Sequence, residues 1–171
     1  QFDIIVICGT ATSTDDYGPS GLQCSLERLA NDGVVIASAD EPSVIRELQN
    51  HDVRTLTYGI HKNADVTAQI FDQSDGVSTL LLTHQDSTTI MEPCLCGYAM
   101  AANHAAAAVV GLLLAEPLER IAESLSQLRT VPGRSQRMVE HGKATVVIDA
   151  GGTPARAVEA MRPCRDMKAG G

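Results

Sequence analysis

The chain has 171 residues, and its 21 acidic side chains outnumber the 13 basic ones, giving a formal charge of -8 and a pI near 5.0. A chain of this length forms one domain, or one domain and part of a second. The acidic balance and an aromatic content of only 3% exclude a nucleic-acid binder, which needs a basic surface and stacking rings. The same charge disfavours an anionic membrane surface.

The five cysteines are scattered, and no secretion signal precedes them, so we expect reduced thiols in a cytoplasmic protein. Cys94 and Cys96 are the only close pair. Without a second Cys/His pair at zinc-ligand spacing, they are better explained as ordinary thiols near the start of a helix. The most apolar stretch, residues 98–115, is rich in alanine and includes Asn103 and His104, which favours a buried helix over a membrane span.

The chain opens on a continuous apolar run over residues 3–8, which is typical of a strand buried on both faces of a parallel sheet. Such strands rarely begin a protein, so we expect that the sequence starts in the middle of a fold. A polar loop over residues 9–18 follows. The next elements alternate with short links: a helix over 22–30, a strand over 34–37, a helix over 43–49 and a strand over 54–58. This order predicts a parallel α/β sheet.

The pattern then changes to three short strands separated by polar turns, over residues 64–71, 77–83 and 88–91. They predict a small antiparallel sheet, separate from the parallel one. Two helices follow, over 99–115 and 117–128. We place a domain boundary at residues 131–134, after which a strand over 144–148, a loop and a helix over 155–161 predict the start of a second α/β unit. The fold class is therefore α/β, with a mainly parallel sheet flanked by helices and a small antiparallel sheet.

Two loops leave the carboxyl ends of predicted parallel strands, where open α/β sheets bind their ligands. In the loop over 9–18, Asp15 and Asp16 could approach magnesium, although helix-capping residues in a plain turn explain the same sequence. In the loop over 149–154, glycines would let a phosphate approach the backbone and Thr153 could cap the next helix. Glycine-rich turns of this kind are also common without a ligand.

Other parts of the sequence limit the chemistry. The phosphate loop G-x-x-x-x-G-K-[ST], the dinucleotide fingerprint G-x-G-x-x-G and the nucleophile elbow G-x-S-x-G do not occur in these 171 residues. The five histidines are isolated from one another, and no two stand at metal-ligand spacing. Arg134 and Arg137 could clamp a phosphate bidentately, or they could be solvated charges of a linker.

The order of several short motifs resembles the Mur ligase family, in particular its UDP-N-acetylmuramoyl-tripeptide synthetase branch. The residues that carry the resemblance are S-A-D-E-P at 38–42, Y-G at 58–59, A-D-V at 64–66, Gly97, Asn103, A-A at 106–107, V-P-G-R at 131–134, V-V-I-D at 146–149 and T-P at 153–154. They cover nearly the whole chain in the family's order.

The resemblance implies an ATP-dependent ligase that converts a carboxylate to an acyl phosphate, which an amine then attacks to form an amide. It implies that residues 1–130 are the C-terminal part of a central, ATP-binding domain and that residues 131–171 begin a Rossmann-like C-terminal domain. The substrates would be a UDP-sugar peptide or a similar carboxylate and an amino acid, as in the peptidoglycan synthesis of the bacterial cell wall. ATP and Mg²⁺ would be the cofactors, and the fragment alone would be inactive.

Four residues match family positions that contact ATP. Asn103 falls on the second Asn of the adenine motif and Arg134 on the Arg of the G-R linker, whereas Asp149 and Thr153 fall on the first and fifth positions of D-Y-A-H-T-P. Asp16 matches a magnesium ligand. An amide suits an adenine edge and a guanidinium suits a phosphate.

Other family positions hold different residues. Leu26 stands where the family has the carbamylated lysine that helps to hold a second magnesium, and an apolar side chain cannot ligate a hard cation. The remaining departures are Thr14 for His, Met100 for the first Asn, Gln136 for Glu, and Ala150-Gly151-Gly152 for Tyr-Ala-His. Two hypotheses therefore stand: a ligase with altered site details, and a non-catalytic binding or scaffold module that has kept the fold and lost the metal site.

Overall fold

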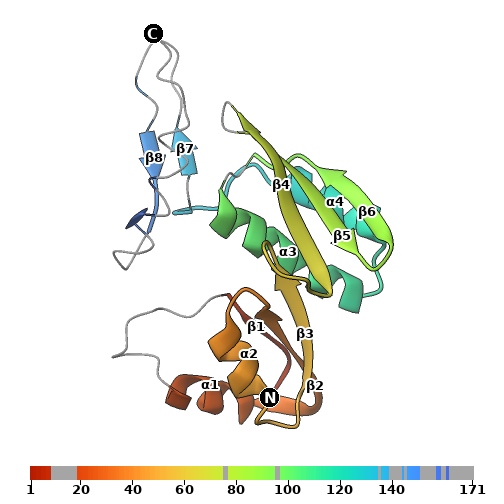
Figure 1. Cartoon of the computed structure of the whole chain (residues 1–171). Coiled ribbons are helices and arrows are strands. Elements are labelled where there is room, and N and C mark those ends of the chain that lie inside the picture. Colours follow the sequence, from red (N-terminus) through yellow and green to blue (C-terminus); the bar gives the residue numbers. More distant parts are fainter. Residues whose placement is uncertain are drawn as a thin grey trace.

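The chain forms one six-stranded sheet with helices on both of its faces, followed by a short two-stranded sheet (Figure 1). The structure, a computed structural model, describes residues 1–8, 19–74, 77–94, 97–134, 136–138, 144, 146–150, 157–158 and 161. Its elements are β1 (Phe2–Ile7), α1 (Pro19–Leu26), β2 (Leu29–Ser38), α2 (Pro42–Leu48), β3 (Arg54–Gly59), β4 (Val66–Ser74), β5 (Val77–His84), β6 (Ser87–Met91), α3 (Tyr98–Leu113), α4 (Leu118–Ser126), β7 (Gln136–Met138) and β8 (Val146–Ile148).

The parallel half of the sheet consists of β1, β2, β3 and the start of β4, in that order. The packing of β2 explains the apolar run over its residues 34–37. Val34 and Ile36 enter the larger core cluster with α3 and α4, whereas Val35 and Ala37 enter a smaller cluster that also contains residues of α2. Because both faces are covered along residues 34–37, each of these four positions favours an apolar side chain.

The antiparallel half, β4-β5-β6, continues the same sheet. Strand β4 pairs with β3 through Tyr58 opposite Val66 and Gly59 opposite Thr67, and then runs antiparallel to β5. The expected antiparallel strands are confirmed, but the expectation of a separate small sheet is wrong. The chain turns back after β3 and re-enters alongside it, so that backbone hydrogen bonds join the two halves.

The largest difference from the predicted boundaries lies between α1 and β2. The helix expected over 22–30 ends at Leu26, and β2 begins at Leu29. The reason is tertiary: the Phe2 amide donates to the Arg28 carbonyl at 2.7 Å, and Phe2 lies opposite Leu29 in the sheet. Strand β7 was not expected at all. Of the helix expected over 155–161, only Ala157, Val158 and Met161 are described, and they are helical.

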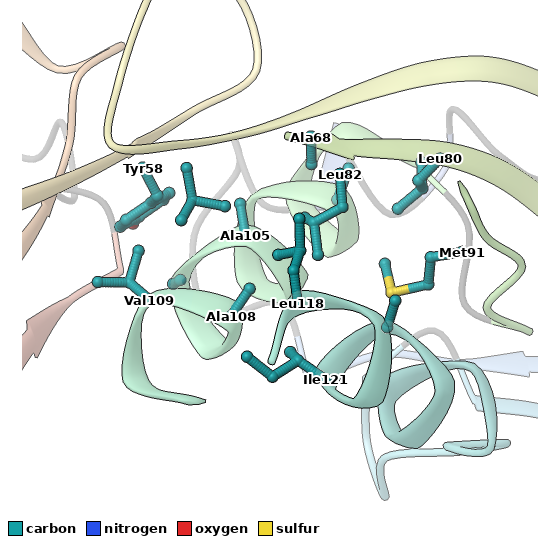
Figure 2. Close-up of a cluster of buried hydrophobic side chains, with 14 of the residues drawn as sticks. Tyr58, Ala68, Leu80, Leu82, Met91, Ala105, Ala108, Val109, Leu118 and Ile121 are labelled. Atoms are coloured by element: carbon teal, nitrogen blue, oxygen red, sulfur yellow. The ribbon is translucent and has the colours of Figure 1, made fainter. Parts of the chain in front are cut away.

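The larger core cluster lies between the sheet and the helices α3 and α4 (Figure 2). Leu80, Leu82 and Met91 of the antiparallel strands belong to the same cluster as Ala105 and Ala108 of α3 and Leu118 and Ile121 of α4. The alanines bring the α3 backbone close to the sheet, which is how a chain without Trp fills its interior. None of the described helices is long and apolar enough to cross a membrane.

Helices α3 and α4 also approach each other closely. A Cβ atom added to Gly111 would lie 2.7 Å from the Ile121 side chain, so this position on α3 has no room for a larger residue. Ile121 therefore packs directly over the α3 backbone, and the two helices form one layer against the sheet.

One buried titratable group lies on α3. His104 is 3% exposed, and its Nε2 atom has no hydrogen-bond partner among the described residues. Burial lowers the pKa of this imidazole below its usual 6.5, because the charged form loses its hydration.

We predict that protonation of His104 destabilises the fold in mild acid. Below pH 6.5 the unfolded chain binds a proton at His104, whereas the folded chain does so only at lower pH. The contribution of His104 should therefore lower the free energy of unfolding by at most about 1.4 kcal/mol for each unit that the pH falls. Urea unfolding at pH 7.5 and pH 5.0 measures the effect. His104→Leu should lose less stability than the wild type between these pH values, and equal losses would contradict the assignment.

Candidate functional site at the carboxyl edge of the sheet

Strands β1, β2 and β3 are parallel, so their carboxyl ends meet at one edge of the sheet (Figure 1). Open α/β sheets bind their ligands at such an edge, because the loops that leave the strands converge there. The described residues at this edge come from the end of β1, the turn between β2 and α2, and the turn that links β3 to β4.

A buried tyrosine, Tyr58, links two strands at this edge. The Tyr58 hydroxyl, from β3, donates to the carbonyl oxygen of Ile7 at the end of β1 at 2.7 Å, although β2 lies between these strands. Burial raises the pKa of Tyr58 far above its usual value, and electrostatic interactions with Cys8, Glu41 and Asp40 raise it further. The phenol therefore stays protonated and remains a donor, which ties the end of β1 to β3.

The carboxylate of Asp40 holds the turn after β3. It accepts hydrogen bonds from the backbone amides of Ile60 at 2.7 Å, His61 at 3.2 Å and Lys62 at 2.9 Å. A carboxylate that receives several backbone amides forms strong, charge-assisted hydrogen bonds. Asp40, part of the S-A-D-E-P motif, is thus a structural residue that joins the β2 turn to the β3 turn.

The same turn requires a glycine and a second aspartate. A Cβ atom on Gly59 would lie 2.6 Å from the Lys62 carbonyl oxygen, so the turn folds back too tightly for any side chain there. Asp65 closes the turn: its Oδ2 accepts from the amide and from the hydroxyl of Thr57, both at 2.7 Å. The A-D-V motif therefore also has a structural explanation.

An aromatic pair brings the start of α3 to this edge. The rings of His61 and Tyr98 lie with their centroids 5.3 Å apart and tilted by 38°. Gly97, which precedes α3, has φ of 95°, a conformation that side chains other than glycine rarely adopt. The contact places the first turns of α3, including Asn103, near the carboxyl ends of the parallel strands.

Asn103 is exposed on α3, and its amide nitrogen lies 3.9 Å from the sulfur of Met100. Met100 is 8% exposed and belongs to the buried face of the helix. The residue at the family's first Asn position thus packs into the interior, and only Asn103 presents an amide on this part of the helix surface.

Arg134 and Asp149 lie on neighbouring segments. The carbonyl oxygen of Gly133 accepts from the amide of Ala150 at 2.8 Å, and the amide of Gly133 donates to the Gln136 side chain at 3.3 Å. One backbone hydrogen bond therefore joins Gly133 and Ala150, which are 17 positions apart in sequence, and brings the neighbouring residues Arg134 and Asp149 onto adjacent segments. Asp16 and Thr153, the other two predicted site residues, lie outside the described residues, as do residues 9–18.

The described residues do not fit a protein-held second magnesium. The Leu26 side chain packs against the smaller core cluster of Val35, Ala37, Val44 and Leu48, where a charged ligand would be desolvated. No group of three or more His, Cys, Asp and Glu side chains in the described part of the chain could hold a metal ion.

Sequence reasoning did not anticipate the structural roles of Tyr58, Asp40 and Asp65. The available signal was their position, because each stands at the end of a predicted strand or beside a turn. That signal does not distinguish a ligand-binding side chain from one that satisfies backbone amides of a loop distant in sequence.

The chain matches the Mur ligase middle domain over residues 24–111, just over half of its length. It is 34% identical, over 116 residues, to the UDP-N-acetylmuramoyl-L-alanyl-D-glutamate--2,6-diaminopimelate ligase of Bacillus velezensis, an alignment that covers 67% of this chain and 24% of the relative. The chain spans about a quarter of the length of the curated relatives it matches.

Two solved structures share the fold. MurF from Acinetobacter baumannii superimposes with a TM-score of 0.78 at 20% identity, over 96% of this chain and 37% of the other. MurF ligase from Thermotoga maritima, solved in complex with ADP, has a TM-score of 0.71 at 16% identity, over 96% of this chain and 39% of the other. The chain belongs to the Mur ligase family.

We predict that Asp40→Asn destabilises the fold. The asparagine side chain has no negative charge, and its NH₂ group is a donor that would face the backbone N–H groups of the turn. The loss of charge-assisted hydrogen bonds should lower the free energy of unfolding by about 1.5–3 kcal/mol, measured by urea unfolding at neutral pH. Asp86→Asn, in the exposed turn between β5 and β6, is the matched control and should change it little. If the two substitutions lower the free energy of unfolding equally, the hydrogen bonds of Asp40 do not have the stabilising role assigned to them.

Proposed function

We propose that this chain is part of an ATP-dependent ligase that joins an amine to a carboxylate in peptidoglycan synthesis. Family membership supports this function, as does similarity to a diaminopimelate ligase that is 34% identical to this chain. In this proposal residues 1–130 belong to a central, ATP-binding domain and residues 131–171 begin a second domain. The substrates are a UDP-sugar peptide, or a similar carboxylate, and an amino acid, and the reaction takes place in the cytoplasm.

The single observation that carries the site assignment is the pairing of the Arg134 turn with the Asp149 segment through the Gly133–Ala150 hydrogen bond. A guanidinium and a carboxylate on adjacent segments can bind different parts of one nucleotide, the phosphates and the ribose. The likeness in fold to a ligase solved with ADP supports a nucleotide ligand. We propose Thr153 for the same site only because its position in the sequence matches the Thr of the family's D-Y-A-H-T-P motif.

Each residue has a distinct part in this proposal. Arg134 binds phosphate oxygens through its planar fork and stabilises the charge that develops on them during transfer. Asn103 binds an adenine edge through its exposed amide, and Asp149 accepts from ribose hydroxyls. The transfer gives an acyl phosphate and ADP, and attack by the amine then releases phosphate. Magnesium enters only as the ion that accompanies ATP, with Asp16 as its proposed ligand.

A specific observation favours a second candidate, a non-catalytic module that keeps the fold. Where the family pattern has polar residues, Met100 is buried and Leu26 is partly buried against the smaller core cluster. A chain that has lost those groups could still bind a nucleotide or a partner without forming an amide. Nucleotide affinity and amide formation, measured on the same protein, distinguish the two candidates.

We predict that the 171-residue chain alone hydrolyses no ATP, because it contains no phosphate loop. Phosphate release from ATP and Mg²⁺ should equal the buffer control, measured with purified chain and with chain heated to unfold it. Release that exceeds the control, requires magnesium and disappears on heating would contradict the assignment of this chain as part of a larger catalytic unit.

A second prediction concerns a longer protein that contains this chain together with the phosphate loop. Arg134→Ala should weaken ATP binding by about 1.5–3 kcal/mol, a tenfold to hundredfold loss, because a hydrogen bond to a charged phosphate is removed. Asn103→Ala should weaken it less, because the adenine edge is uncharged. Calorimetric titration with a non-hydrolysable ATP analogue measures both.

Two further substitutions serve as controls for this experiment. Arg129→Ala removes an exposed arginine five positions away and should leave the affinity unchanged, and Arg134→Lys should recover part of the loss because it keeps the charge. Melting curves identify any variant that fails to fold. If all four variants bind as the wild type does, the carried-over site is wrong and the non-catalytic module is favoured.

A further inference from the structure

The Asn103 side chain donates a hydrogen bond to Met100, three residues earlier on α3. The amide nitrogen Nδ2 lies 3.9 Å from the sulfur atom Sδ. Residues three apart on a helix lie on the same side of it, which is why these two side chains meet. A thioether sulfur accepts hydrogen bonds and cannot donate them. The nitrogen of the amide, and not its oxygen, therefore faces Met100.

Met100 can hold this amide because its own side chain is fixed. It is 8% exposed and lies on the buried face of α3. The first turn of the helix, to which Met100 belongs, is held by the contact between the rings of Tyr98 and His61. The Asn103 side chain, by contrast, is exposed, and an exposed amide can rotate about its last torsion unless it is bound.

The orientation of the amide decides which chemical group it recognises. With one N–H of Nδ2 directed at the sulfur, the second N–H and the oxygen Oδ1 remain for a ligand. An acceptor beside a donor matches an adenine edge, which offers the N6 amino group beside a ring nitrogen. A half-turn of the amide would put the nitrogen where the oxygen was. It would then favour a base with a carbonyl group in place of the amino group.

We propose that Met100 is a positioning residue, whose sulfur holds the Asn103 amide with Oδ1 available to the ligand. The site thereby prefers a purine with an amino group at C6 over a purine with a carbonyl group there. This inference rests on the proposed function, in which Asn103 binds the base of ATP. Met100 itself is buried and acts only through Asn103. The residue that departs from the family pattern thus serves the site through its neighbour.

Base discrimination tests the proposal, in a longer protein that contains this chain together with the phosphate loop. Calorimetric titrations with the non-hydrolysable imido analogues of ATP and ITP give two dissociation constants. Their ratio reports selection at C6, where adenine has an amino group and hypoxanthine a carbonyl group. The wild type should prefer the ATP analogue, and Asn103→Ala should remove most of this preference, because no amide then reads the group at C6.

Met100→Leu keeps the size and apolar character of the side chain and removes the sulfur acceptor. It should lower the preference for the ATP analogue about twofold to fivefold, because a hydrogen bond to sulfur is weak. Met91→Leu is the matched control. Met91 is also a buried methionine, 0% exposed, but it lies on β6 in the larger core cluster (Figure 2). Its substitution should leave the ratio unchanged, and melting curves verify that each variant is folded.

The outcomes separate this inference from the proposed function. If Asn103→Ala removes the preference and Met100→Leu leaves it intact, the positioning role is wrong and the proposed function stands. An equal loss in Met91→Leu would also overturn the positioning role, because altered core packing would then explain both results. If the wild type binds neither analogue, the proposed function fails and the inference fails with it.

Discussion

Two residue pairs join the parallel and antiparallel halves of this sheet: Tyr58 with Val66, and Gly59 with Thr67. The turn between them has to leave β3, fold back on itself and return parallel to it within six residues. Three backbone amides of that turn would otherwise lack protein partners, and the carboxylate of Asp40 binds all three. Asp65 binds Thr57 at the other side of the turn, so two carboxylates fix the junction.

This junction also determines the shape of the candidate site. Because Asp40 comes from the β2 turn, it ties the carboxyl ends of β2 and β3 together, and the Tyr58 hydroxyl ties β3 to β1. Three parallel strands thus end at a rigid edge, to which the His61–Tyr98 contact adds the start of α3. Groups used in this scaffold are occupied by protein partners. A ligand at this edge would therefore be bound by side chains on the surrounding surface, such as Asn103.

The departures from the family pattern take on a physical meaning once the packing is known. Leu26 and Met100 are apolar replacements: Met100 is buried, and Leu26 is partly buried and packs against the smaller core cluster. At each of these two positions the family pattern has a polar residue, whereas the apolar side chain present here adds buried contacts that stabilise the fold. Gln136, which replaces a carboxylate, accepts from the Gly133 amide and stabilises the turn that carries Arg134. The substituted positions contribute to the fold.

The sequence by itself determined the α/β class, the strands β1 to β6, the four helices α1 to α4 and the family, because apolar periodicity and ordered motifs are local properties. It failed where a distant partner decides the structure. Leu29 has helical spacing from Leu22 and Leu26, yet it lies in a strand because Phe2 pairs with it. Likewise, Asp40 and Asp65 stand in motifs that could equally well bind a ligand. Only the tertiary structure decided that their oxygens bind amides some 20 and 8 residues away, since the hydrogen-bond partner of a carboxylate is fixed by the folded path of the chain.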